Sequence, residues 1–248
     1  MILPPEYKVI SNNHEITVSE ISELYGEKGN FRVMQFSNAA LQGALDLNEP
    51  DRIVFEYPRV MIHLMECNDA SFENVFVIGH GIGTIASHFP EKRFKIAEVD
   101  HNVVDLSRRY FGYSMDNVMI GDGRHILEGE DSDTYDYIIL DAFNSKGTPQ
   151  HLISQEFFKI TADKLTPQGS IIINLMGRGE NDSLINAIHS TLRQVYTYTL
   201  SFILPGDRFT DVQNMIMIGR NIPIRFQARQ MAGFIEMHLG TGHIILDY

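Results

Sequence analysis

The sequence has a single cysteine and no tryptophan, and its 248 residues contain no long uncharged apolar segment. One cysteine cannot form a disulfide within the chain, so we expect a protein of the reducing cytoplasm. The apolar runs are far shorter than the roughly 20 residues of a membrane helix, so we expect no membrane association. The first residues carry no basic segment ahead of an apolar one, and we expect no secretory signal.

Basic residues are also scarce, with 20 Lys and Arg against 32 Asp and Glu and a net charge of −12. Affinity for nucleic acid comes largely from Lys and Arg on phosphates, so we expect no nucleic-acid partner. An acidic protein attracts cations, which permits an amine or polyamine substrate. The histidines lack a paired metal-ligand spacing such as H-E-x-x-H, so we predict no metal site.

The chain changes character along its length. Residues 1–60 contain short alternating segments separated by Asn, Gly and Asp, which predict a small N-terminal β-domain. A proline followed by apolar residues at helical spacing predicts a helix over 58–66. Residues 61–220 form the predicted catalytic domain, and 221–248 are predicted to be a C-terminal helix and tail.

From residue 74 onward predicted strands and helices alternate, which favours a parallel sheet covered on both faces. The final two strands, 196–204 and 214–218, are joined without a helix and predict a hairpin. The predicted fold class is therefore α/β, a methyltransferase-type Rossmann fold whose mostly parallel sheet has a terminal antiparallel hairpin strand. The expected parallel strands are 75–78, 93–100, 117–120, 135–141 and 170–176.

A glycine-rich turn follows the first of these strands in the sequence VIGHGIG at 77–83. Gly79, Gly81 and Gly83 allow the backbone to turn tightly and to approach a ligand closely. The helix expected after the turn supplies unpaired N–H groups. Strand, turn and helix together predict a nucleotide cradle.

An acidic residue, Glu98, follows Gly79 by 19 positions and ends the second predicted strand. An acid at about this spacing binds ribose hydroxyls in nucleotide-binding βαβ units. The dinucleotide fingerprint G-x-G-x-x-G needs a further glycine where this chain has Thr84. The pattern G-x-G-x-G thus favours a nucleoside without a pyrophosphate, such as S-adenosylmethionine or a relative.

Two further strand ends carry candidate site residues, because ligands bind at the carboxyl ends of strands in open α/β sheets. Asp122 and Gly123 follow the third strand, where a carboxylate and an N–H can meet an adenine ring. A helix N-cap explains Asp122 equally well. Asp141 ends an apolar strand, a costly place for a charge unless it binds something.

These motifs resemble the polyamine aminopropyltransferases, the spermidine synthases, over residues 41–218. The resemblance lies in VIGHGIG at 77–83, AEVD at 97–100, GDG at 121–123, YDYIILD at 135–141 and HLISQEFF at 151–158. It implies an enzyme that transfers an aminopropyl group from decarboxylated S-adenosylmethionine to an amine, and it also implies a homodimer.

The resemblance also implies roles for single residues. Glu98 would bind ribose, Asp122 and Gly123 would bind adenine, and Asp141 would be the catalytic residue. The substrate pocket would contain Tyr57, Asp141 and Asn144.

The chain departs from the family pattern at three places. Ile82 stands where the glycine loop usually carries an aspartate, Asn144 replaces the second acid of the motif D-S-x-D-P, and Arg59 replaces an early glutamate. Two alternatives therefore stay open: a methyltransferase that uses S-adenosylmethionine, and a non-catalytic protein that binds a nucleoside.

Overall fold

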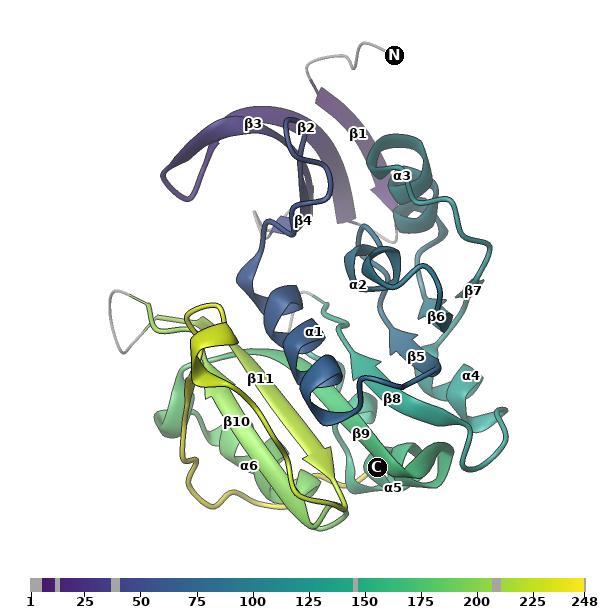
Figure 1. Ribbon diagram of the computed structural model, residues 1–248, viewed down its shortest axis with the longest axis vertical. Coiled ribbons are helices and arrows are strands. Elements are labelled where there is room, and N and C mark those ends of the chain that lie inside the picture. The colour runs from purple at the N-terminus through teal and green to yellow at the C-terminus, as the bar shows by residue number, and fades with distance from the viewer. Residues whose placement is uncertain (1–5, 12–13, 37–40, 145–146, 207–210, 248) are drawn as a thin grey trace.

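The computed structural model describes residues 6–11, 14–36, 41–144, 147–206 and 211–247. Two sheets organise this part of the chain (Figure 1). The first is an antiparallel N-terminal sheet in the order β1-β2-β3-β4. Its strands are β1 Glu6–Ser11, β2 His14–Leu24, β3 Glu27–Phe36 and β4 Leu41–Asp46.

The second sheet has eight strands in the order β12-β10-β11-β9-β8-β5-β6-β7. Neighbours from β9 to β7 pair in parallel, as the apolar strands of the sequence predicted. These strands are β5 Asn74–Ile78, β6 Arg93–Glu98, β7 Val118–Ile120, β8 Tyr135–Leu140 and β9 Leu165–Gly177.

The predicted hairpin is confirmed in β10 Tyr198–Ile203 and β11 Gln213–Arg220. Its antiparallel strand, β11, lies inside the sheet between β9 and β10. The short strand β12 Ile235–Glu236 pairs with β10 at the edge. Residues 207–210 of the connection fall outside the described residues.

Residues along each strand point alternately to opposite faces of this sheet, and apolar residues occupy both faces. Helices therefore cover both faces. On β5, Phe76 and Ile78 pack with α4, α5 and α6, whereas Val75 and Val77 pack with α1 and α2. The helices are α1 Glu56–Asn68, α2 Thr84–His88, α3 His101–Phe111, α4 Gly123–Glu128, α5 Gln155–Lys164 and α6 Ser183–Leu192.

The N-terminal sheet is joined to the rest of the molecule by α1 and by α3 (Figure 1). Its residues Ile16, Val18 and Met34 form a buried cluster with Val103 and Leu106 of α3. This packing places β4 beside the carboxyl ends of the parallel strands, where the site lies. The domain boundaries at residues 60 and 220 stay predictions.

The C-terminal helix predicted within residues 221–248 is wrong, because the described residues 221–247 contain no α-helix. The described residues 225–247 contain the 3₁₀ turn Ala228–Gln230 and strand β12. The remainder is irregular: residues 225–227 lie against α1, where Asn68 and His63 accept from the Arg225 and Gln227 N–H groups, and residues 240–245 lie over α6. Side chains replace helical hydrogen-bond partners there: Asn186 accepts from Gly240 N–H and Ser190 accepts from Gly242 N–H. A Cβ at Gly242 would lie 2.3 Å from the Ala187 nitrogen, so the segment passes directly over α6.

Candidate active site

The glycine loop lies between β5 and α2 and has left-handed backbone at all three glycines. The φ angles of Gly79, Gly81 and Gly83 are +97°, +54° and +82°. A Cβ at Gly79 would lie 2.0 Å from the carbonyl oxygen of Asp141, and one at Gly83 would lie 2.2 Å from the ring of Tyr113. Only glycine fits these positions, so the loop is held tightly against the end of β8.

Glu98 supports this loop from the end of β6. Its buried carboxylate accepts hydrogen bonds of 2.9 Å from the His80 N–H and the Asp100 N–H. Burial raises the pKa of Glu98, which the backbone donors only partly offset. Each carboxylate oxygen can accept a further hydrogen bond, which is what two ribose hydroxyls require.

His80 is fixed as a neutral imidazole behind the loop. The Ser107 hydroxyl donates to the Val104 carbonyl, so the His80 Nε2–H donates to Ser107 Oγ, 2.7 Å away. Burial, together with the charge of Arg108, lowers the pKa of His80 to about 4. At neutral pH the loop therefore carries no histidine charge, and His80 serves to hold its shape.

Asp122 is the N-cap of α4, accepting from the His125 N–H at 2.9 Å, and its other oxygen lies 2.9 Å from His151 Nε2. Burial raises the pKa of Asp122, but the His125 N–H and His151 outweigh this and hold it below its usual value. Gly123 is buried, and a Cβ there would lie 2.4 Å from Ile78. The N-cap interpretation is thus observed, and the adenine contacts stay a prediction.

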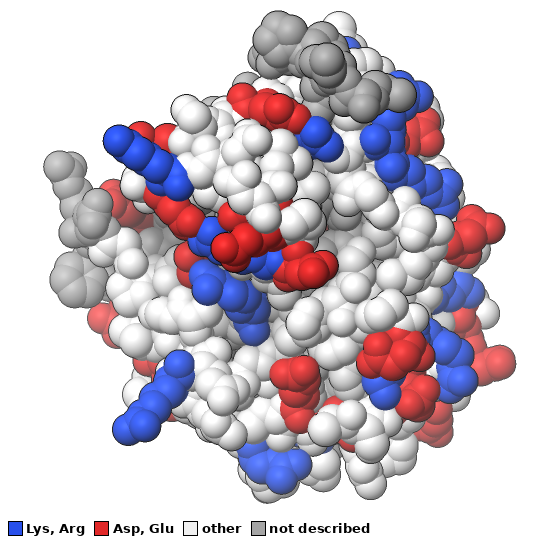
Figure 2. Space-filling view, turned by 45° about the horizontal axis from the view of Figure 1, so that its top comes forward, with Lys and Arg blue, Asp and Glu red and all other residues white. Residues whose placement is uncertain are grey.

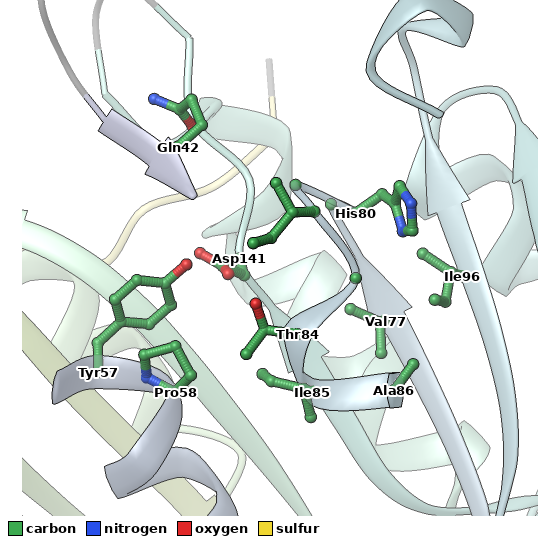
Figure 3. Close-up of a pocket in the computed structure, with 14 residues that line it drawn as sticks. Gln42, Tyr57, Pro58, Val77, His80, Thr84, Ile85, Ala86, Ile96 and Asp141 are labelled. Carbon is green, nitrogen blue, oxygen red and sulfur yellow. The ribbon is translucent and has the colours of Figure 1, made fainter. Parts of the chain in front are cut away.

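Asp141 lies at the end of β8 and points toward Tyr57 of α1 (Figure 3). The Tyr57 hydroxyl donates a hydrogen bond to its carboxylate, and Asn174 Nδ2 donates a second at 2.9 Å. Asn214 in turn donates to Asn174 Oδ1 at 3.2 Å. Burial raises the pKa of the Asp141 carboxyl, although these neutral donors partly counteract it.

A narrow cavity of about 30 Å³ joins these elements. This volume holds about one water molecule, so the cavity fits a reacting group and not a whole nucleoside. Its lining residues are Gln42, Tyr57, Pro58, Val77, Gly79, His80, Gly81, Ile82, Gly83, Thr84, Ile85, Ala86, Ile96 and Asp141.

The structure brings five of the predicted site residues into this cavity: Tyr57, Gly79, Gly81, Gly83 and Asp141. Four predicted residues lie outside its lining: Glu98, Asp122, Gly123 and Asn144. Glu98 is connected to the glycine loop by the hydrogen bond from the His80 N–H, and Asp122 and Gly123 begin α4.

Asn144 is exposed on the loop after β8, where its backbone pairs with that of Gly147. The neighbouring Ser145, which belongs to the same sequence motif, lies outside the described residues.

Four polar residues of the site, Asn174, His80, Thr84 and Gln42, were not among the site residues predicted from the sequence. Asn174 could have been recognised in the sequence, because it is a polar residue inside the apolar strand IIINL. His80 and Thr84 lie within the glycine motif itself. Gln42 could not have been recognised in the sequence, because β4 reaches the cavity only through the packing of the N-terminal sheet.

The family model and the curated relatives agree on one family. A family model described as the spermine/spermidine synthase domain matches residues 54–220. The chain belongs to this family. Spermidine synthase of Coffea arabica is 29% identical over 207 residues, covering 76% of this chain and 64% of the relative. Polyamine aminopropyltransferase of Vibrio vulnificus is 30% identical over 165 residues, covering 63% of this chain and 54% of the relative.

A solved structure supports the fold independently. A probable spermidine synthase from Corynebacterium glutamicum superimposes with a TM-score of 0.76 at 20% identity, over 90% of this chain and 82% of the other. The methyltransferase-type Rossmann fold with a small N-terminal sheet is thus confirmed. The chain spans less than two thirds of the length of the two curated relatives above.

The three departures from the family pattern can now be placed. Ile82 lines the cavity and packs against β4, where a Cβ at Gly43 would lie 2.5 Å from it. Arg59 is exposed and donates to Glu56 and to the Phe55 carbonyl. Asn144 is exposed, outside the cavity lining.

Membrane spans and metal clusters were both expected to be missing from this chain. No helix among the described residues is both long and apolar enough to cross a membrane. Within the same ranges, no group of three or more His, Cys, Asp or Glu side chains is arranged to hold a metal ion. The absence of a resident metal stays a prediction from the sequence.

The hydrogen bond from Asn174 to Asp141 gives a first testable prediction. In Asn174→Ala the Asp141 carboxylate loses a hydrogen-bond donor, so its pKa should rise further. Activity that depends on the ionised carboxylate should then be lost at a higher pH, which moves the acid limb of the pH–rate profile to higher pH. We expect kcat to fall about 10-fold at neutral pH, the effect of one hydrogen bond to a charged group. The measurement is kcat as a function of pH.

Asn214→Ala is the matched control, because it removes only the outer hydrogen bond, to Asn174 Oδ1. It should leave the acid limb in place. Equal profiles for the two variants would show that Asn174 supports the strand without acting on Asp141.

Proposed function

We propose that this protein transfers the aminopropyl group of decarboxylated S-adenosylmethionine to a small amine or polyamine. Asp141 carries this proposal: a carboxylate at a strand end, with a raised pKa and neutral hydrogen-bond partners, lines a cavity beside the glycine loop. Family membership and the names of the relatives support the same reaction.

In the proposed reaction the amine nitrogen attacks the propyl carbon next to the sulfonium. The carbon–sulfur bond breaks, its electron pair stays on sulfur, and methylthioadenosine leaves. An alkylammonium has no lone pair, so it must lose a proton before it attacks. Asp141 would orient the ammonium and accept that proton. Because the pKa of Asp141 is raised, it lies closer to the pKa of the ammonium group that loses the proton.

The other residues would bind and orient the substrates. Tyr57 and Asn174 hold the Asp141 carboxylate in position through their hydrogen bonds. Glu98 would accept from the ribose hydroxyls, and Asp122 with the Gly123 N–H would contact adenine. The glycine loop would approach the nucleoside closely, since it has no side chains at its three glycines.

We also propose that the protein acts in the cytoplasm and forms a homodimer. The single cysteine supports the first statement, because it requires no oxidising compartment. The second follows from the family resemblance.

A methyltransferase is the second candidate, and Ile82 is the observation that favours it. An apolar side chain in the cavity lining does not bind the amine of an aminopropyl group as a carboxylate would. This side of the cavity would then tolerate the carboxylate of intact S-adenosylmethionine. A comparison of the two forms of the nucleoside separates the candidates.

Calorimetric titration with each form is that experiment. We expect tighter binding of the decarboxylated form, and we expect Glu98→Gln to weaken it by about 10- to 100-fold, because the amide accepts with one oxygen only. Glu73→Gln is the matched control, since it removes one negative charge from an exposed residue at the opposite end of β5. Tighter binding of intact S-adenosylmethionine would favour methyl transfer.

A further inference from the structure

The turn that carries Asp122 is held by residues far from it in the chain. We propose that Asp247 is a positioning residue for the adenine site. Through Arg124 it holds His151 against Asp122, and so fixes the carboxylate that would accept from the adenine amino group. This inference rests on the proposed function, in which Asp122 contacts adenine, and it adds to that function a device that selects an aminopurine.

His151 fixes the direction of the Asp122 carboxylate. Asp122 Oδ1 accepts from the His125 N–H at 2.9 Å, and Oδ2 lies 2.9 Å from His151 Nε2. An ionised carboxylate only accepts, so the His151 Nε2–H is the donor. Each carboxylate oxygen keeps a further acceptor position, which now has a fixed direction. A purine amino group can donate there, whereas a purine carbonyl oxygen in its place would meet a carboxylate with no proton between them.

Arg124 connects this pair to the C-terminal segment. It lies in the first turn of α4, and its Nη1 donates to the His151 carbonyl oxygen at 3.1 Å. Nη1 and Nη2 also donate to the two carboxylate oxygens of Asp247, at 2.9 Å and 2.6 Å, and Nε donates to Glu128 at 3.0 Å. Every nitrogen of the guanidinium has an acceptor, so the group is held in one orientation.

Asp247 is itself anchored to two helices. The buried Ile245 donates its N–H to Thr191 Oγ1 of α6 at 2.9 Å, and its carbonyl accepts from the Gln155 N–H of α5 at 2.8 Å. The Asp247 N–H donates to Glu156 of α5 at 2.9 Å. Figure 1 shows this end of the chain beside α5. The carboxylate therefore has a fixed place from which it holds the guanidinium.

The pair of Arg124 and Asp247 differs from an ordinary surface ion pair. Figure 2 shows acidic side chains beside basic ones on one face of the molecule, and exposed pairs of that kind contribute little. The Arg124 side chain is only 17% exposed. Its contact with Asp247 is bidentate, which fixes the angle between the two groups as well as their distance. A change at Asp247 should therefore be felt at His151.

Two nucleosides that differ in one group test this inference. Methylthioadenosine has the purine amino group, and methylthioinosine has a carbonyl oxygen in its place. The readout is the calorimetric Kd of each. We expect the wild-type protein to bind methylthioadenosine about 10-fold more tightly or better, since a site built to accept a hydrogen bond rejects a ligand that lacks the donor.

Asp247→Asn should reduce this preference. The amide has one acceptor oxygen and turns an N–H toward Arg124, so the bidentate contact is lost. We expect methylthioadenosine to bind about 5-fold more weakly or worse, which is part of what a hydrogen bond to a charged group contributes. The Kd of methylthioinosine should change little, because that nucleoside does not use the acceptor position of Asp122.

Two further variants serve as controls. Asp247→Glu keeps a carboxylate for Arg124 and should retain most of the preference, which a general effect on the fold would not explain. Asp116→Asn makes the same chemical change at an exposed acid beside Arg108, just before β7 and at the end of the sheet away from the site. It should leave both dissociation constants unchanged.

Three results would overturn the inference: an Asp247→Asn variant that keeps the wild-type preference, one that loses affinity for both nucleosides equally, and a wild-type protein that does not prefer methylthioadenosine. None of them bears on aminopropyl transfer, which is measured separately by the release of methylthioadenosine from decarboxylated S-adenosylmethionine. Absence of that release would overturn the proposed function.

Discussion

Asp141→Asn should reduce kcat/KM for aminopropyl transfer by about 10³-fold, the middle of the range for a group that takes a proton in the transition state. The amide has nearly the same shape, and its single oxygen can still accept from Asn174, but it neither compensates an ammonium nor takes its proton. The measurement is the release of methylthioadenosine under saturating nucleoside. Binding of the nucleoside itself should change little.

The same variant should be at least as stable as the wild type at neutral pH. Because the pKa of Asp141 is raised in the folded state, its ionisation lowers the free energy of unfolding as the pH rises from the ordinary carboxyl pKa through the raised one. The introduced amide does not ionise, so the advantage of the variant should disappear below the ordinary carboxyl pKa. A variant that keeps its activity, or that unfolds at neutral pH, would contradict the role given to Asp141.

Gly79→Ala should have the largest effect on stability, about 4 kcal/mol or more, the range reserved for severe steric conflicts. Its φ angle is +97°, and the new methyl group would lie 2.0 Å from the Asp141 carbonyl oxygen. Relief of that contact requires the loop and the end of β8 to separate, so activity should also be lost. Urea unfolding measures the free energy, and the release of methylthioadenosine measures the activity.

Gly112→Ala is the matched control for that variant. Gly112 caps α3 with a φ of +75°, but no other atom lies within 4 Å of its added Cβ. The substitution should therefore cost only the left-handed backbone energy, about 1–2 kcal/mol. If the two variants lost the same free energy of unfolding, the contact between the loop and Asp141 would not be the reason that position 79 requires glycine.

The sequence predicted the parts of the site that are local in the chain. The glycines of the loop and the acid at the next strand end are linked by a fixed spacing, and Glu98 indeed binds the His80 N–H. Parallel strands also end at one edge of a sheet, so Asp141 was placed near the loop from its position alone. These inferences need only strand order and the geometry of a βαβ unit.

The rest depends on contacts between distant segments. Tyr57 meets Asp141 only because α1 packs against β11 and β8, and Gln42 reaches the cavity only because β4 lies over the loop. The C-terminal segment was predicted wrongly because the apolar residues Met231 and Phe234 do pack on the sheet, but in irregular backbone around Gly233. Periodicity alone does not distinguish such a segment from a helix.

The most direct test of the proposed reaction is to incubate the wild-type protein with a simple amine and, in parallel, with decarboxylated or intact S-adenosylmethionine, and to identify the nucleoside product. We predict that the wild-type protein forms methylthioadenosine from the decarboxylated form, that Asp141→Asn forms it about 10³-fold more slowly, and that no S-adenosylhomocysteine is formed from the intact form. Formation of S-adenosylhomocysteine without methylthioadenosine would contradict aminopropyl transfer and assign the site to methyl transfer.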